Sequence, residues 1–314
     1  MPFQLKVEYS PIYELTTSLH LYLEKKAHRV TDLGKSWVKE ADTKLQPGLK
    51  KKLTQMMEQS EEAFWDKKLF QYFLAKTTLD SPAKEEVDGF LDWLSGQSSE
   101  DLYMNVDWRE QWGLSMDEWK SMHQLVVEVV DQWNQQYFRH IDPAILHVLK
   151  EDADRKQRLS ERLDAVEVVE QATKGIRLQP INEVRTLILI PQYHYAPINL
   201  FEYGNPLTWK YAVDFPPQSS DDPPRSLVRF SSSLGDPNRL RILRFIAEEA
   251  RSFMEIVHYV GLAKSTVNHH LVHLRAAGLV QLDYHPDKGT GLYRLREKAL
   301  DQVGSELKAY LKSE

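Results

Sequence analysis

The chain has 314 residues, of which 42% are hydrophobic, enough to bury a sizeable core and to predict two domains. It contains no cysteine, so disulfide bonds and thiolate metal sites are excluded. No apolar run approaches the length of about 18 residues typical of a membrane span. The N-terminus lacks the apolar core of a signal peptide, so we expect a cytoplasmic protein without membrane contact.

Charge is divided unevenly along the chain. The formal net charge is −6, yet the part from Arg225 onward has 14 basic and 10 acidic residues and carries +4. The preceding part carries −10. A basic C-terminal domain favours contact with phosphates, whereas an acidic front domain would be held away from them.

The first 213 residues are predicted to form a mainly α domain of the α+β class. Alternating apolar residues predict a strand at 3–9, and Ser10 with Pro11 begins the first helix. Further helices are expected at 47–59, 61–76, 82–95, 116–139 and 143–173. The spacing of apolar residues then changes to the alternation typical of strands, which are predicted at 184–190, 197–203 and 207–213. We predict that they form a small antiparallel sheet, which could include the strand at 3–9.

A polar, proline-rich segment at 214–225 cannot continue a helix and is predicted to be a linker. It would separate an effector or sensor domain at 1–213 from a second domain at 226–314.

Three helices with short connections are predicted after the linker. Asp236 and Pro237 begin the first helix. Ser252 caps the second, and Gly261 supplies the left-handed residue that ends it before a tight turn. A strand, a turn and a returning strand follow the third helix, which indicates a hairpin.

The third helix, at 263–277, buries Val267, Leu271 and Leu274 at i, i+4 and i+7. Its N-terminal half should therefore point outward. Small hydrogen-bonding and basic side chains of this kind reach base edges and phosphates. The predicted DNA contacts are Lys264, Ser265, Thr266, Asn268, His269 and His270.

The hairpin is predicted to be a wing that also meets DNA. Its turn spans 285–291 and contains Lys288 and Thr290, and Arg294 follows on the returning strand. We expect these three side chains to contact DNA, mainly at the phosphates.

This order of elements is typical of a winged helix-turn-helix, and residues 226–314 resemble the ArsR family. The resemblance rests on Leu234-Gly-Asp-Pro-Asn-Arg-Leu-Arg-Ile-Leu, Ser265-Thr-Val-Asn-His-His-Leu and Leu274-Arg-Ala-Ala-Gly-Leu-Val. It implies a dimeric regulator of transcription, usually a repressor, that binds double-stranded DNA through 263–277. Ala263 departs from the family, which usually has a serine or similar cap there, so helix entry is expected to be looser. The long form resembles a bacterial subgroup, and the family name implies no function for its N-terminal domain.

The terminal helix, at 296–312, carries an apolar stripe that is too large for an isolated surface helix. The stripe consists of Leu300, Val303, Leu307, Tyr310 and Leu311. The resemblance implies that this is the dimer helix of a homodimer. The alternative is that the stripe packs on the front domain of the same chain.

No metal and no cofactor are predicted. The metal sensors that the family contains use cysteines on the second helix or His and acidic residues on the terminal helix. Here residues 252–260 contain no Cys and 297–314 contain no His. His269, His270 and His273 could share a metal, but we favour DNA contact and packing against the wing.

All eight tryptophans precede the linker. Five lie close together in sequence: Trp93, Trp108, Trp112, Trp119 and Trp133. They could line a pocket for an organic small molecule, or alternatively form ordinary helical core. His194, between two tyrosines after a predicted strand, could belong to a catalytic or ligand-gating loop, or alternatively to a structural turn. A metal held by His147 and Glu151 is a further alternative for this domain.

The sequence has no phosphate-binding glycine loop, no His-Glu-x-x-His and no Gly-x-Ser-x-Gly, so we predict that the protein is not an enzyme. We expect a DNA-binding regulator whose operator affinity changes when an organic molecule binds the N-terminal domain. The alternative is a constitutive DNA-binding or protein-interaction module without an effector.

Overall fold

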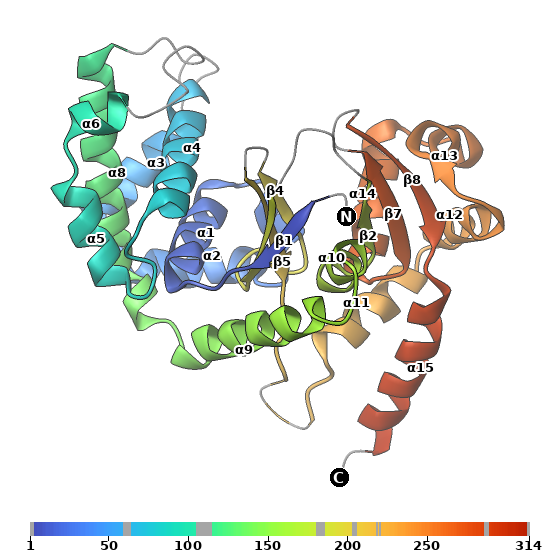
Figure 1. The fold of residues 1–314 in the computed structure, drawn as a ribbon. Helices are drawn as coiled ribbons and strands as arrows, with labels where there is room; N and C mark the ends of the chain where they lie inside the picture. Colours follow the sequence, from blue (N-terminus) through green and yellow to red (C-terminus); the bar gives the residue numbers. More distant parts are fainter. Residues whose placement is uncertain are drawn as a thin grey trace. The chain divides into compact units, whose positions relative to one another are not determined.

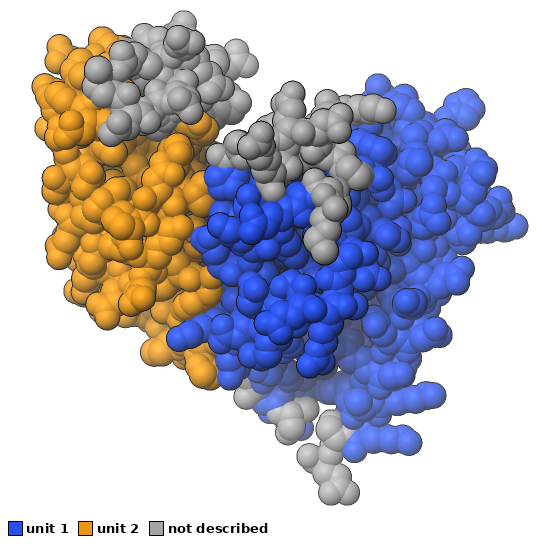
Figure 2. All heavy atoms as spheres, viewed as in Figure 1, with its two compact units in different colours: residues 1–8, 148–314 blue, residues 9–147 orange. Residues whose placement is uncertain are grey.

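A computed structural model describes residues 3–58, 64–104, 115–179, 186–202, 206–217, 219, 221–285 and 289–312. The chain divides into two compact units, residues 9–147 and residues 1–8 with 148–314 (Figure 2). Helices make up most of the described structure and the strands form small sheets (Figure 1), so the expected class is confirmed. Among the described residues, no helix is long and apolar enough to cross a membrane.

The unit of residues 9–147 is helical. Its first helix begins as expected, because the Ser10 hydroxyl accepts a hydrogen bond from the Ile12 N–H. Its elements are α1 (Pro11–Leu23), η1 (Ala27–Arg29), α2 (Gly34–Lys44), α3 (Pro47–Glu58), α4 (Phe64–Asp80), α5 (Val87–Gly96), α6 (Ser99–Met104), α8 (Met116–Gln136) and η2 (Phe138–His140). Tyr22 and Trp133 are among the largest fully buried side chains and lie in its core.

The single helix expected at 143–173 is in fact two helices, α9 (Pro143–Ser160) and α10 (Ala165–Thr173). Asp164 starts α10 with a capping box, in which its carboxylate accepts the Glu167 N–H and the Glu167 carboxylate accepts the Asp164 N–H. This start signal lies inside a charge-dense stretch that otherwise favours helix throughout, which is why the sequence alone suggested one element.

The first sheet has the order β1-β3-β5-β4. It consists of β1 (Gln4–Val7), β3 (Thr186–Gln192), β5 (Leu207–Ala212) and β4 (Leu200–Glu202). β1 pairs with β3 and β3 with β5 in parallel, and β4 pairs with β5 antiparallel. The expected antiparallel sheet is therefore wrong, although the first strand does belong to it. A near-continuous apolar run such as β3 is typical of a parallel strand that is buried on both faces.

The second sheet has the order β2-β7-β8-β6. The predicted wing forms its centre as β7 (Val280–His285) and β8 (Thr290–Leu295), and β6 (Arg251–Ser252) lies at one edge. The other edge is β2 (Ile176–Leu178), which comes from the predicted front domain and pairs with β7 in parallel. Because of this pairing, the compact units do not coincide with the predicted domains on either side of 214–225.

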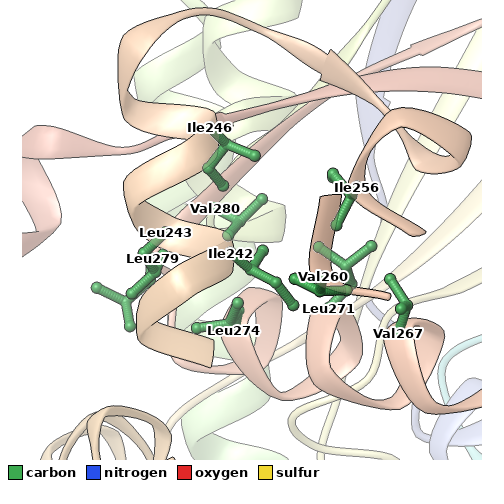
Figure 3. Packing of buried hydrophobic residues seen from close by; sticks show 10 residues of the cluster. All are labelled: Ile242, Leu243, Ile246, Ile256, Val260, Val267, Leu271, Leu274, Leu279 and Val280. Atoms are coloured by element: carbon green, nitrogen blue, oxygen red, sulfur yellow. The ribbon is translucent and has the colours of Figure 1, made fainter. Parts of the chain in front are cut away.

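The described helices of the C-terminal part are α11 (Arg225–Leu234), α12 (Pro237–Glu248), α13 (Phe253–Val260), α14 (Lys264–Ala276) and α15 (Glu297–Lys312). Helices α12, α13 and α14 close over one apolar core with the start of the wing (Figure 3). Its buried members are Ile242, Leu243, Ile246, Ile256, Val260, Val267, Leu271, Leu274, Leu279 and Val280.

Candidate nucleic-acid interface

Helix α14 is fixed in place by the turn that precedes it and by its inner face. Gly261 ends α13 with a φ of 71°, a left-handed conformation that glycine adopts without strain. No side chain caps the N-terminus of α14, where Ala263 stands, and the looser entry expected there stays a prediction. Val267 and Leu274 are fully buried, and Leu271 is nearly so. Packing of the buried face therefore holds α14 in place without a side-chain cap.

The opposite face of α14 is open to solvent over its N-terminal half. Five of the six side chains expected to point outward are exposed: Lys264, Ser265, Thr266, Asn268 and His269. They present hydroxyls, an amide, an imidazole and an ammonium group on one surface. Such a surface can read base edges and neutralise phosphates, and these roles stay predictions.

His270 corrects the sequence-based expectation because its side chain is only 7% exposed. It follows Val267 by three residues and so lies on the same inward stripe. Its Nδ1 atom is 3.9 Å from the Asp236 carboxylate, which caps α12 by accepting the backbone N–H groups of Asn238 and Arg239. Burial lowers the pKa of His270 below its usual 6.5, and Asp236 offsets this only in part. His270 is therefore buried beside the start of α12 instead of pointing outward.

His269 and His273 form a pair on the flank of α14. Their Nε2 atoms are 3.1 Å apart, a distance at which one imidazole donates a hydrogen bond to the other. Burial, reinforced by the nearby His269, lowers the pKa of His273 below 6.5. Within the described residues, no three His, Asp or Glu side chains gather as metal ligands.

The structure separates the predicted wing contacts. Thr290 is exposed at the tip, opposite His285, and Lys288 lies outside the described residues. Arg294 is at the base of the wing, opposite Gln281, and its Nε atom is 3.7 Å from the Asp283 carboxylate. Arg294 is thus apart from the tip and already has an acidic neighbour.

The apolar stripe of α15 is largely open in the single chain. Leu300 and Leu307 are each 41% exposed and Leu311 is 70% exposed, whereas Val303 and Tyr310 are partly buried. The Tyr310 hydroxyl donates to the Asp221 carbonyl at 2.8 Å. These three exposed leucines form an apolar surface on which a second protein chain can pack.

Among the candidate effector residues that the structure describes, three are buried in the core. Trp119 and Trp133 are 3% and 0% exposed, and their indole N–H groups donate to the Ser99 carbonyl and the Ser18 hydroxyl. Trp93 is partly buried and stacks on Phe90. Trp108 and Trp112 lie outside the described residues. His194 is 0% exposed, so it does not line an open surface. These observations favour the packing alternative for the described members of the cluster.

Sequence reasoning missed the strand that joins the wing. Gly175 with Ile176 and Leu178 offered a short signal, a helix stop followed by alternating apolar residues, but three residues are too few to predict a strand. It also missed Arg239, whose guanidinium donates to the carbonyls of Ser232 and Ser233 and so ties α12 to the end of α11.

A family model matches part of this candidate interface. Residues 236–281 match a family model described as "Bacterial regulatory protein, arsR family". The crystal structure of NolR from Sinorhizobium fredii is 28% identical, with a TM-score of 0.23, and the match covers 27% of this chain and 85% of that one. No curated protein matches the chain. The family match extends from the start of α12 to the first residues of β7.

Proposed function

We propose that the protein is a DNA-binding transcriptional regulator, and more closely a homodimeric repressor controlled by an organic effector. Its C-terminal part matches the model of the bacterial regulatory proteins of the arsR family. The observation that carries the DNA-binding role is the exposed face of α14. Five adjacent polar side chains lie there on a helix held by Val267, Leu271 and Leu274. Repression is supported by the family resemblance of the three sequence segments.

A direct test of DNA binding uses the full chain and a 30-base-pair duplex of random sequence. The logarithm of the affinity should fall linearly with the logarithm of salt concentration, because each phosphate contact releases a counterion. Lys264→Ala should lower the slope by about one per protomer. Glu297→Ala, an exposed change at the start of α15, is the control and should not lower it. Binding that is independent of salt would contradict the proposal.

Dimerisation is supported by the open leucines of α15. A stripe with Leu311 70% exposed costs free energy in water, and a second copy of the same helix can cover it. A two-fold dimer would also present two α14 helices to successive major grooves. The alternative, in which the stripe packs on another part of the same chain, predicts a monomer.

Control by an organic effector is supported by the size of the unit of residues 9–147 and by the lack of cysteine in the whole chain. A regulator with no input has no need of a compact helical unit of that size. The effector would have to bind the DNA-competent and DNA-incompetent states with different affinity, since only this difference shifts their populations.

A screen for compounds that change the affinity for DNA distinguishes a regulator with an organic effector from a constitutive DNA-binding protein. The affinity of the full chain for duplex DNA is measured with members of a metabolite and drug library, and with zinc and nickel as metal controls. The proposal expects an organic compound that changes the affinity. A response to a metal alone, or no response at all, would overturn the effector and leave a metal-dependent or constitutive DNA-binding protein.

A further inference from the structure

We infer that β2, a strand that precedes β7 of the wing by about a hundred residues along the chain, positions the wing for contact with DNA. This inference rests on the proposed DNA binding and deepens it. The ladder joins Ile176 to Leu282, Arg177 to Asp283 and Leu178 to Tyr284 in parallel. It covers the edge of β7 that a two-stranded wing would leave open.

The backbone contact is close at both ends of the ladder. The Leu282 N–H donates to the Gly175 carbonyl at 2.8 Å, and the Gln179 N–H donates to the Tyr284 carbonyl at 2.9 Å. Gly175 has a φ of 125°, and a Cβ atom added there would lie 2.8 Å from the Val280 carbonyl oxygen. Only glycine fits this approach, because another residue would have both a strained backbone and a clash.

Side chains join β2 and the wing to the first sheet. Ile176 and Leu178 are 3% and 1% exposed. On the next strand, the ring of Tyr284 meets Phe201 and Trp209 edge to face, with centroids 5.8 and 6.4 Å apart. Aromatic contacts of this geometry stabilise packing beyond the area that they bury.

Polar contacts also connect the segment before β2 to β5 and to α11. The Asn199 amide donates to the Thr173 carbonyl at the end of α10, and its oxygen accepts the Ala212 N–H of β5. The carboxylate of Asp214 binds both Lys174 and Arg229, which links the residue before Gly175 to α11. The segment that ends in β2 is therefore held to the same framework as the DNA-binding helices.

Pairing of the wing with β2 should lower the entropy cost of DNA binding. A two-stranded hairpin is only marginally stable in water, and a mobile wing must be ordered when it meets the phosphates. With β2 paired and Tyr284 packed, the wing is already held relative to α14 before DNA arrives. Gly175 and Tyr284 act as positioning residues, since neither has to touch DNA for this effect.

The test measures DNA binding by the full chain after the ladder is weakened. Gly175→Ala introduces the clash with Val280, and Gln179→Pro removes one ladder N–H at the other end of β2. Arg177→Lys is the matched control, because it keeps the charge and the backbone pairing of the same strand. Hydrogen exchange of residues 280–285 reports whether the ladder has opened, and circular dichroism reports whether the chain is folded.

The readout is the salt dependence of affinity for a random 30-base-pair duplex. We expect the slope to fall by about one phosphate contact per protomer in Gly175→Ala and to a smaller extent in Gln179→Pro, with Arg177→Lys unchanged. Loss of folded protein alone lowers the active fraction and leaves the slope intact, and if Gly175→Ala does not fold, Gln179→Pro provides the comparison. An opened ladder with an unchanged slope would overturn the positioning role. Failure of the wild type to bind DNA would instead refute the proposed function, and this inference with it.

Discussion

Neighbouring residues on α14 have different environments. Asn268 and His269 are exposed, but His270 is buried against the Asp236 side of α12. The heptad-like spacing of Val267, Leu271 and Leu274 was enough to predict the helix and its core face. It did not predict His270, because a residue at the border of the inward stripe is buried or exposed according to which helix packs there.

Asn268 is predicted to read a base. An asparagine amide can form a bidentate pair with adenine, so Asn268→Ala should cost about 1–3 kcal/mol on preferred DNA and relax the preference at one base position. Lys288→Ala should instead weaken binding about equally on all sequences, as expected for a phosphate contact. Affinities of both variants on selected and random duplexes check this. An equal loss on both kinds of DNA for Asn268→Ala would refute its role in readout.

His270 gives the winged helix a predicted pH dependence. Its pKa is lowered in the folded state, so the unfolded chain takes up the proton first as pH falls below about 6.5. The free energy of unfolding should therefore be highest above that pH and should decrease below it. His270→Gln should flatten this decrease, as measured by urea unfolding at pH 7.5 and 5.5. His258→Gln, an exposed change on α13, is the control, and an equal flattening by it would contradict the assignment.

Strongly periodic helices and the hairpin could be predicted from the sequence, whereas pairing between distant segments could not. Helices α12, α13 and α14 and the wing were found because caps, a left-handed glycine and apolar spacing agree locally. The parallel pairing of β1 with β3 and of β2 with β7 depends on contacts between residues far apart in the chain. Short strands carry no sequence signal for such a partner, and the break between α9 and α10 needed a cap that the surrounding charges obscured.

The stripe on α15 is predicted to hold the dimer together. Leu307→Glu places a charge among the exposed leucines and should produce a monomer at micromolar concentration. Gln302→Glu is the control, because it adds the same charge to a side chain that lines the groove beside α10 instead of the leucine stripe. Sedimentation or light scattering gives the mass of each variant. A dimeric Leu307→Glu, or a monomeric wild type, would contradict this interface.

One of the eight tryptophans lies beside the predicted wing. Trp209 on β5 contacts Tyr284 of the wing, so it should report on this junction. Binding of duplex DNA should change tryptophan emission in the wild type, and Trp209→Phe should remove most of that change. Trp93→Phe, in the other compact unit, should retain it. The same change in both variants would show that the signal arises elsewhere.

Basic and acidic residues are divided unevenly along the chain. The part from Arg225 carries +4 and the rest −10, so long-range attraction to DNA should come from the C-terminal part. Composition alone predicted this asymmetry. It could not predict that residues 148–213 share a compact unit with the basic part, because that grouping depends on β2 and on the packing of Tyr284.

Selection of duplex DNA from a random pool by the full chain tests whether the protein is a sequence-specific DNA-binding dimer. We expect enrichment of an inverted repeat whose half-sites are about one helical turn apart, as a two-fold dimer with one α14 per major groove requires. Asn268→Ala should enrich a repeat that is relaxed at one position of each half-site. A pool that remains random after repeated rounds, at low salt and with wild-type protein shown to be folded, would contradict the account.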